Sequence, residues 1–580
     1  MARPRAVHTP IAPEKDIRYL IVDGYVDEPA ALGVPPYISP HVRAIAGGLV
    51  TGGAPPSSVG YLTVDSWRAL RGCGWGMGEL KRLDAVFCIM GCTVPGKYLR
   101  GTPISIREVG ELASSLREVP LILWGKTTPP EQMGILSCRG DPGVLGLRFS
   151  REGRIADGHP TDEELNQHLR EGAFVIEQHP DHPSPLIAEI ETSRGCVRYM
   201  TGGCSFCMEP ARGRIRYRGV DDILEEVRAL SEHGVENIRL GGQSDIISYR
   251  TPEAGISETP VPDPEVVEVL FNGLERELLS GAGVEKARGL GRRPGLECGI
   301  IHTDNANPAI ISTHPEEAER ILTTIASHTT SGNVLALGLE SADPAVTEAE
   351  NLNSTPEQTI AAIELMNRVG KRRGSNGLPR LLPGINFLGG LPSQTVSSFD
   401  HDRAFLQEVI KRGLLLRRIN IRTALFRRGG GLRTVWKDGR VKRAYRRFRD
   451  HVREVVDREM LSGLLPDGSC LKGVFMEARS GNTTFGRQIG SYPILVGIPY
   501  GTDLDEFRDV IITDRGRRSV TGFITPFHVN RASLGELTAL PGVGRKRAAS
   551  IKRASPLDRE LLRRIAPETD PYSGSLRFDP

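Results

Sequence analysis

The sequence reads Leu186-Ile187-Ala188-Glu189-Ile190, then Thr192-Ser193-Arg194-Gly195-Cys196, and after seven more residues Cys204-Ser205-Phe206-Cys207. The first run is apolar enough to predict a buried strand, and three cysteines crowd the loop behind it. Three thiolates on one short loop can hold three irons of a 4Fe-4S cluster and leave the fourth iron open to a small molecule. The alternatives are a zinc site, which needs a fourth protein ligand, and a disulfide with a spare thiol.

Strand and helix patterns alternate from residue 184 to residue 426. An amphipathic helix is expected from Asp221 to Glu232, followed by a strand at Asn237 to Gly242. Further strands are expected at Val334 to Glu340 and at Ile385 to Gly390, and Arg418 to Arg422 has the pattern of the last strand. This alternation predicts a partial (β/α) barrel, in which active sites collect at the carboxyl ends of the strands.

The three-cysteine loop resembles that of the radical S-adenosylmethionine (radical SAM) superfamily. Phe206 occupies the position of the family's aromatic residue before the last cysteine, and the two-residue gap before Cys207 matches. The family usually has three residues in the first gap, whereas this chain has seven. The resemblance implies that Cys196, Cys204 and Cys207 bind a 4Fe-4S cluster, that S-adenosylmethionine chelates its open iron, and that a ferredoxin- or flavodoxin-type donor supplies the electron.

Three further motifs resemble cofactor-binding positions of the same superfamily. Gly241-Gly242-Gln243 stands where the family has Gly-Gly-Glu, whose backbone carbonyls accept from the methionine ammonium. Glu340-Ser341 matches a pair that contacts ribose or carboxylate, and Gly389-Gly390 matches a turn that lies close to adenine. His302 and Asp304 follow another strand, where they either point to the substrate mouth or form a polar turn.

The segment from residue 16 to residue 150 predicts a Rossmann-like α/β domain. Short apolar runs such as Tyr19 to Gly24, Ala85 to Ile89 and Val119 to Gly125 are typical of buried parallel strands. The position before the barrel resembles either a cobalamin-binding domain or the N-terminal domain of methylthiotransferases, which carries a second iron-sulfur cluster. The cobalamin-ligating pattern Asp-x-His-x-x-Gly is absent after the first strand. Four cysteines can supply ligands for a second cluster or pack as small hydrophobic residues: Cys73, Cys88, Cys92 and Cys138.

A one-sided block of charge begins after the barrel, in the segment from 427 to 470 that we expect to be a basic helical connector. Residues 427 to 449 contain ten Lys or Arg and one acid, Asp438, with Trp436, Tyr445 and Phe448 interleaved. A solvated helix face usually mixes both signs, so this block indicates a polyanionic partner.

Two small modules are expected at the end of the chain. Five short strand patterns between residues 471 and 528 predict an OB-like β-barrel, which resembles the TRAM domain of tRNA-modifying enzymes. Residues 530 to 580 contain Leu540-Pro541-Gly542-Val543-Gly544-Arg545-Lys546-Arg547, which resembles a helix-hairpin-helix motif. Gly542 and Gly544 let backbone N–H groups approach a phosphate, and Arg545, Lys546 and Arg547 add positive charge. The alternatives are a plain packing barrel and a protein-docking hairpin.

The composition limits the possible settings of the protein. With 580 residues the chain predicts about three to five domains. Hydrophobic residues make up 39%, and no apolar run is long enough to cross a bilayer. Nine cysteines without a disulfide framework, together with a start that lacks a secretory signal, predict a reducing cytoplasm.

Taken together, these resemblances imply a cytoplasmic radical SAM enzyme that modifies a nucleic acid, with tRNA as the leading substrate and insertion of sulfur or a methylthio group as the leading reaction. Three alternatives stay open: a cobalamin-assisted methyltransferase, a DNA-repair enzyme, and a non-catalytic iron-sulfur protein that binds nucleic acid. The sequence names neither the base nor the choice between RNA and DNA.

Overall fold

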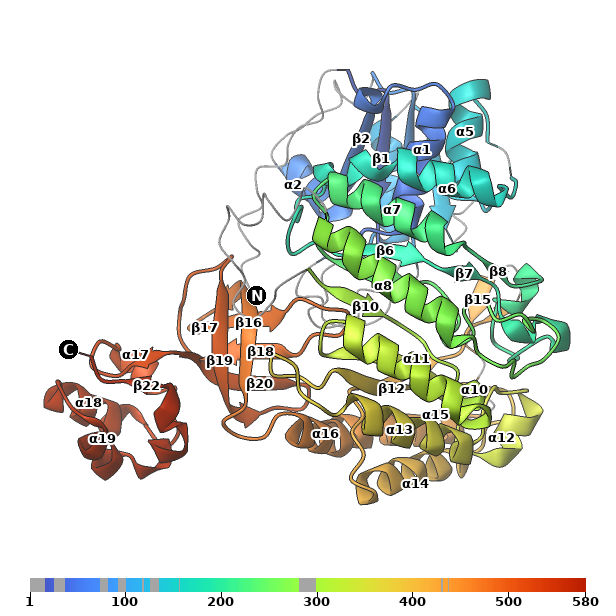
Figure 1. Ribbon diagram of the computed structural model, residues 1–580. Helices are drawn as coiled ribbons and strands as arrows, with labels where there is room; N and C mark the ends of the chain where they lie inside the picture. Colours follow the sequence, from blue (N-terminus) through green and yellow to red (C-terminus); the bar gives the residue numbers. More distant parts are fainter. Residues whose placement is uncertain are drawn as a thin grey trace.

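The computed structural model (Figure 1) is an α/β molecule with a small all-β barrel and a helical lobe at its C-terminal end. It describes residues 16–25, 37–72, 82–91, 101–116, 119–125, 135–155, 157–280, 299–428, 431–434, 436 and 438–579. Within this part of the chain no helix combines the length and the apolar character needed to cross a membrane.

The N-terminal unit is built on a five-stranded parallel sheet in the order β2-β1-β3-β4-β5. Its strands are β1 (Tyr19–Asp23), β2 (Val59–Thr63), β3 (Ala85–Met90), β4 (Leu121–Gly125) and β5 (Leu136–Cys138). Alternate residues of each strand face two separate cores, so Ile21 packs toward α1 (Pro40–Thr51) and α5 (Pro142–Glu152), whereas Leu20 packs toward α2 (Val64–Gly72) and α4 (Ile106–Leu116). Burial on both faces explains why the strands are continuous apolar runs.

A buried ion pair fixes the N-terminal unit to the barrel. Arg43 of α1 is fully buried. It donates to Glu226 on α7 (Val220–Glu232) at 2.5 Å and to the Glu189 carbonyl at 2.6 Å. Arg218 donates to the other Glu226 oxygen at 2.5 Å. Burial alone would raise the pKa of Glu226, but the positive charges of Arg218 and Arg43 hold it below its usual range. The buried pair of Arg43 with Glu226 therefore connects the N-terminal unit to the barrel.

Six parallel strands in chain order form the wall of the barrel. They are β6 (Ala188–Glu191), β9 (Ile238–Gly241), β10 (Ile301–Thr303), β11 (Asn333–Glu340), β12 (Leu381–Gly389) and β13 (Arg418–Thr423). The wall consists of two three-stranded sheets, and the seam between β10 and β11 is closed by the hydrogen bond from the Ala306 N–H to the Ala336 carbonyl at 3.0 Å. The alternation expected from the sequence is therefore present as a partial barrel.

Helices cover the outer side of this wall, as Figure 1 shows. Besides α7 they include α8 (Pro264–Ser280), α10 (Pro308–Thr313), α11 (Pro315–His328), α13 (Pro356–Gly370) and α14 (Ser398–Lys411). Their apolar faces meet the strands in one continuous core.

The helical part of the basic segment after the barrel packs against the barrel. Its helix α15 (Gly439–His451) buries Val441, Ala444, Tyr445 and Phe448 in the barrel core and contacts α14. These positions follow the helical period, so two of the aromatic residues that seemed to interleave with the cations are core residues. A π-helical turn (Val452–Val456) joins α15 to α16 (Asp457–Leu464).

A closed five-stranded barrel follows, in the order β16-β17-β18-β20-β19. Its strands are β16 (Cys470–Ser480), β17 (Thr483–Gln488), β18 (Leu495–Ile498), β19 (Phe507–Arg515) and β20 (Ser519–Thr525). All pairs are antiparallel except β18 with β20. The five short strands expected from the sequence are thus present.

The last lobe carries α17 (Leu534–Leu537), α18 (Arg545–Ala554) and α19 (Arg559–Ile565). It shares a core with the small barrel, because Phe523 contacts Phe527 and Tyr572 edge-on and the short strand Phe527–His528 pairs with Leu576–Arg577. A boundary near residue 530 would therefore cut through a packed interface.

Candidate active site

The three cysteines lie on the loop at the carboxyl end of β6. Short strands β7 (Ser193–Arg194) and β8 (Arg216–Tyr217) pair and close the ends of this loop. Within it, Gly195, Gly202 and Gly203 have φ angles of 95°, 79° and 60°. This left-handed conformation favours glycine, so the sequence allows a wide loop to fold back tightly.

Cys196, Cys204 and Cys207 form no disulfide within the described part of the chain, and all three are half-buried. Burial raises the pKa of Cys204 to about 12, the Glu340 carboxylate adds to this rise, and the charges of Cys196 and Cys207 also act on it. Burial likewise raises the pKa of Cys196. These thiols would therefore lose their protons to a metal rather than to water at neutral pH.

Arg198, inside the seven-residue gap, is a site residue that the sequence reasoning missed. It is only 4% exposed, and its Nη1 lies 3.4 Å from the Cys204 sulfur. The same Nη1 donates to the Asn351 carbonyl at 3.0 Å, and Nη2 donates to Asn351 Oδ1 at 2.8 Å. The long first gap thus brings a fixed positive charge next to the Cys204 sulfur.

Glu350 ties the cysteine loop to the glycine turn after β12. Its Oε2 accepts from the Ser205 hydroxyl at 2.5 Å, and its Oε1 accepts from the Ser393 N–H at 2.8 Å. Phe206 and Cys204 pack against Leu391 in the same region. Glu350 therefore connects the cysteine loop to the turn that follows β12. A lone Glu after a short helix carries no signal for this role in the sequence.

The Gly241-Gly242-Gln243 turn lies beside the cysteine loop, where the Ser244 hydroxyl donates to the Gly195 carbonyl at 2.9 Å. A side chain at Gly241 would collide with Glu189, whereas Gly242, with φ 76°, is exposed. The Gln243 side chain points inward and donates to the Leu240 carbonyl at 3.1 Å and the Asp304 carbonyl at 2.9 Å. The backbone of this turn is thus open to a ligand, and the glutamine side chain supports it.

Glu340 and Ser341 end β11 with different roles. Glu340 adopts a φ of 63° at a bulge, and burial raises the pKa of its carboxyl to about 8. Its charge contributes to the raised pKa of Cys204. The buried Ser341 hydroxyl lies 3.3 Å from Asp402 Oδ1 and is thereby held in the barrel wall.

Gly389-Gly390 ends β12. A Cβ on Gly389 would lie 2.3 Å from the Tyr445 ring, so glycine is needed for α15 to pack there. Gly390 has a φ of 83° and turns the chain back toward Leu391. The predicted cofactor motifs therefore meet at one rim, the carboxyl ends of β6, β9, β11 and β12.

His302 and Asp304 do not reach that rim. The imidazole accepts from the Ser491 N–H at 2.9 Å, burial lowers its pKa to about 4, and Asp304 pairs with Arg239 at 2.5 Å and with the Tyr492 hydroxyl. His302 lies within β10 and not in a turn, and Asp304 directly follows this strand. They join the large barrel to the loop between β17 and β18.

The helical hairpin lies far from the cysteine loop, and Figure 1 shows α18 and β7 at opposite sides of the molecule. Gly542 has a φ of 72°, and Gly544 precedes α18 without a side-chain cap. Arg545 and Lys546 are exposed, whereas Arg547 donates to the Gly542 carbonyl at 2.7 Å and pairs with Glu568 at 2.8 Å. Arg547 therefore stabilises the hairpin itself.

The donor atoms of the cysteine loop are those that an iron-sulfur cluster needs. It offers three thiols that act on one another, an exposed glycine turn beside them, and no fourth cysteine in the loop. In the described ranges no group of three or more His, Cys, Asp or Glu side chains is arranged to hold a single metal ion, as a zinc site would need. Cys88 and Cys138 are buried at 0% and 1% exposure in the N-terminal sheet, and Cys73 and Cys92 lie outside the described residues.

Comparison with known proteins agrees with this arrangement. Residues 190–404 match the model of the radical SAM superfamily. The uncharacterized protein MJ0274 of Methanocaldococcus jannaschii is 37% identical over 529 residues, which are 87% of this chain and 93% of that protein. The tRNA-2-methylthio-N(6)-dimethylallyladenosine synthase of Acinetobacter baylyi is 27% identical over 241 residues, which are 40% of this chain and 41% of the synthase.

Among solved structures, the radical S-adenosylmethionine methyltransferase TsrM of Kitasatospora setae aligns with a TM-score of 0.41 and 14% identity, over 70% of this chain and 72% of TsrM. The superfamily match spans the cysteine loop and the rim motifs, and the relative from M. jannaschii is similar over nearly its whole length. The chain therefore belongs to the radical SAM superfamily, in the same family as the M. jannaschii protein, and shares partial similarity with the tRNA methylthiotransferases.

Proposed function

We propose that this protein cleaves S-adenosylmethionine reductively and uses the resulting radical to modify a nucleic acid, with tRNA as the substrate and sulfur or methylthio insertion as the reaction. The observation that carries the proposal is the similarity to the tRNA-2-methylthio-N(6)-dimethylallyladenosine synthase over 40% of this chain. The chain also matches the model of the radical SAM superfamily. A ferredoxin- or flavodoxin-type protein would supply the electron.

In this proposal the rim residues bind and position the cofactors. Cys196, Cys204 and Cys207 would hold the 4Fe-4S cluster, which would supply the electron for cleavage of the sulfonium. The backbone of Gly241-Gly242-Gln243 accepts from the methionine ammonium, and Gly389-Gly390 admits the adenine. With a pKa of about 8, the Glu340 carboxyl is largely protonated at neutral pH and can donate a hydrogen bond to ribose. The contact of the Ser341 hydroxyl with Asp402 in the barrel wall would fix the backbone next to Glu340.

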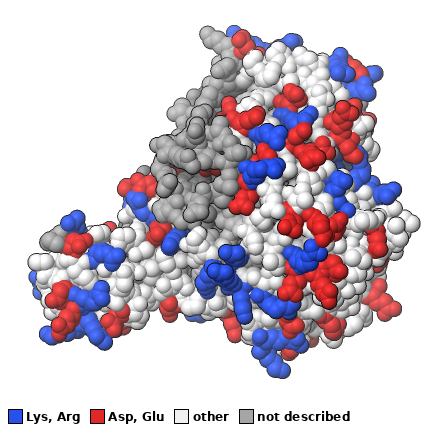
Figure 2. Space-filling view, in the orientation of Figure 1, with Lys and Arg blue, Asp and Glu red and all other residues white. Residues whose placement is uncertain are grey.

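Two surfaces support a nucleic acid as the partner. The outer side of α15 exposes six cations, of which Lys442, Arg443, Arg446 and Arg447 form no ion pair with any residue that the structure describes. Over the helices in view in Figure 2, by contrast, acidic and basic side chains are interspersed. The exposed Arg545 and Lys546 at the start of α18 add a second cationic site, where a helix N-terminus favours a phosphate.

A cobalamin-assisted methyl transfer is the second candidate. The order β2-β1-β3-β4-β5 is one of the common doubly wound orders, which bind ligands at the carboxyl edge where the strand order reverses. Here that edge lies between β1 and β3, and the segments that follow both strands are outside the described residues. Bound cobalamin in protein purified from cobalamin-supplied cells would favour this candidate, and iron in excess of one cluster would favour a second iron-sulfur cluster.

The proposed substrate is tested by mass spectrometry of nucleosides from total tRNA. A strain that lacks the gene should miss one sulfur-containing nucleoside, and the wild-type gene should restore it. The Cys204→Ala variant should not restore it, because the cluster would lose one of its three ligands. Identical nucleosides with and without the gene would contradict the tRNA assignment.

The hairpin is tested in the same strain. An Arg545→Gln/Lys546→Gln variant keeps the rim intact, so it should lower the amount of modified nucleoside and weaken RNA binding while its iron content stays that of the wild type. Arg563→Gln on α19, an exposed arginine paired with Asp570 at 3.3 Å, is the matched control. Unchanged RNA binding in the double variant would assign the hairpin to protein docking.

A further inference from the structure

A pocket separate from the cysteine loop lies at the seam between the large barrel and the small β-barrel. It is formed by the amino end of β13, by α16 and by the turn between β19 and β20, so it lies at the end of β13 away from the active-site rim. Its walls combine apolar side chains, three arginines and one acid: Leu416, Arg417, Ile419, Asp457, Met460, Leu461, Leu464, Arg517 and Arg518.

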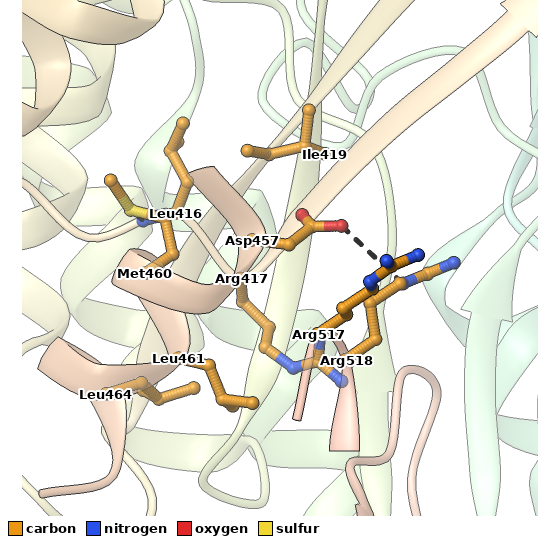
Figure 3. A pocket seen from close by; sticks show the side chains of 9 residues that line it. All are labelled: Leu416, Arg417, Ile419, Asp457, Met460, Leu461, Leu464, Arg517 and Arg518. Atoms are coloured by element: carbon orange, nitrogen blue, oxygen red, sulfur yellow. Dashed lines mark hydrogen bonds and ion pairs between the residues drawn. The ribbon is translucent and has the colours of Figure 1, made fainter. Parts of the chain in front are cut away.

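The polar wall of this pocket has more cations than acids. Figure 3 shows Arg517 and Arg518 beside the Asp457 carboxylate, with the apolar side chains of α16 on the other side. Arg518 Nε lies 3.8 Å from Asp457, and the same carboxylate oxygen already accepts from Arg453 at 2.7 Å. Arg517, which is 70% exposed, pairs with Glu454 at 3.1 Å. Around the pocket, four arginines therefore share two carboxylates among the residues that the structure describes.

Two of the arginines, Arg417 and Arg518, are also partly withdrawn from water. Burial, with the neighbouring Arg518 charge, lowers the pKa of Arg417 to about 10. Burial and Arg453 lower the pKa of Arg518. The Arg417 guanidinium donates to the carbonyls of Tyr492 at 3.0 Å and Pro493 at 2.9 Å, so it is held in position by neutral groups. Like charges kept together in a desolvated place cost free energy, which an anion would offset.

We propose that this pocket binds a phosphate group. A guanidinium offers paired N–H donors that match the oxygens of phosphate, and three of them line one small space. The apolar floor, formed by Met460, Leu461 and Leu464, carries no polar group to recognise a base or a sugar. The phosphate belongs either to the backbone of a polynucleotide or to a free phosphate compound. The polynucleotide source rests on the proposed function, whereas the site itself does not.

A helix leads directly from the exposed cations of α15 to this pocket. Residues 439 to 464 form α15, the π-helical turn and α16 in succession, and Arg453 and Asp457 lie where they join. A polynucleotide backbone that follows the cations of α15 would therefore reach the pocket along one continuous support.

The test uses the full chain and three variants. Arg517→Gln/Arg518→Gln removes two cations from a surface turn, and Arg508→Gln, on β19 and paired with Glu506, is the matched control for loss of a surface arginine. Glu454→Gln removes the competing partner of Arg517. Calorimetry with inorganic phosphate and fluorescence anisotropy with a single-stranded RNA oligomer, each at several salt concentrations, measure the two probes.

The double variant should bind phosphate at least about tenfold more weakly than the wild type, because charge-assisted hydrogen bonds are lost. On RNA it should lower the slope of log affinity against log salt by about 0.7 for each lost contact. Arg508→Gln should match the wild type. Glu454→Gln should bind more tightly, which a merely damaged fold would not do.

The two probes separate the sources. Loss of RNA binding with little effect on inorganic phosphate supports a backbone phosphate, and the opposite supports a free phosphate compound. If the double variant binds phosphate more weakly than the wild type, and the wild type cleaves no S-adenosylmethionine, the phosphate site is supported and only the proposed function is overturned. Equal affinities of the double variant and Arg508→Gln for both probes would overturn the site.

Discussion

At the scale of single residues, the long gap between the first two cysteines has a physical role. It places Arg198 with Nη1 3.4 Å from the Cys204 sulfur and fixes it through two hydrogen bonds to Asn351. Hydrogen bonds to the sulfurs are among the properties that set the reduction potential of a cluster, and a fixed cation favours the more negative, reduced state. The departure from the usual cysteine spacing thus brings in a group that the shorter loop would lack.

We therefore expect Arg198→Gln to shift the cluster to a more negative midpoint potential, measured by redox titration under anaerobic conditions. In the apoprotein the same change should raise the pKa of Cys204 further, and each unit lowers the thiolate fraction about tenfold, which slows alkylation by iodoacetamide. Arg212→Gln, at an exposed arginine of the same loop paired with Glu209 at 3.3 Å, should change neither property. An unchanged potential in Arg198→Gln would show that the arginine is only a structural support.

Sequence reasoning found the cysteines because their chemistry depends on residue type and spacing. Arg198 lies inside the same loop, yet an arginine in a loop is usually solvated, and only the folded structure shows that it is buried between Asn351, Glu258 and Cys204. Glu350 is a stronger case, because its two partners, Ser205 and Ser393, are far away in the sequence. Partners of this kind depend on tertiary packing, which no local pattern contains.

At the scale of elements, α15 shows where pattern and structure separate. The excess of cations predicts a polyanionic partner, and this stays a prediction. The apolar residues between the cations belong to the barrel core, where Tyr445 packs so close to Gly389 that a Cβ there would collide with its ring. The strands were easier to predict, since runs buried on both faces, such as β3, are apolar throughout. The joint between the small barrel and the last helices was not predicted, because shared cores leave no mark on either segment alone.

The contact between α14 and the end of β11 contains a titrating group, Asp402. Its carboxylate accepts from the Ala342 N–H at 2.7 Å, yet burial raises its pKa from 3.8 to about 8. The folded protein thus binds more protons here than the unfolded chain, so the contribution of Asp402 to stability is complete below pH about 4 and is lost as the pH rises through about 8.

The apoprotein should therefore lose stability between pH 5 and pH 8 with a slope of about 1.4 kcal/mol per pH unit from this group. Asp402→Asn should flatten the slope, as measured by urea unfolding at several pH values. Asp400→Asn, at an exposed residue of the same helix paired with Arg403 at 2.9 Å, should leave it unchanged. Equal slopes in Asp402→Asn and the wild type would refute a neutral Asp402.

At the scale of the whole molecule, the rim of the large barrel gathers four sequence motifs, while the cationic surfaces lie elsewhere. The Arg43–Glu226 pair fixes the N-terminal unit, the Asp304–Tyr492 contact fixes the small barrel, and the last helices share the core of that barrel. A large substrate that touches α15 and the hairpin would thus meet one continuous body. The chemical role of the rim depends most on the cysteine loop, because the rim can act on S-adenosylmethionine only if a cluster binds there.

That dependence is tested by loading the protein with iron and sulfide under anaerobic conditions and adding dithionite and S-adenosylmethionine. Chromatography with mass detection then measures 5'-deoxyadenosine. The wild type, with about four irons at this loop, should release it, and Cys204→Ala should release none. Absence of the product from fully loaded wild-type protein, with and without RNA, or equal release by Cys204→Ala, would contradict the account.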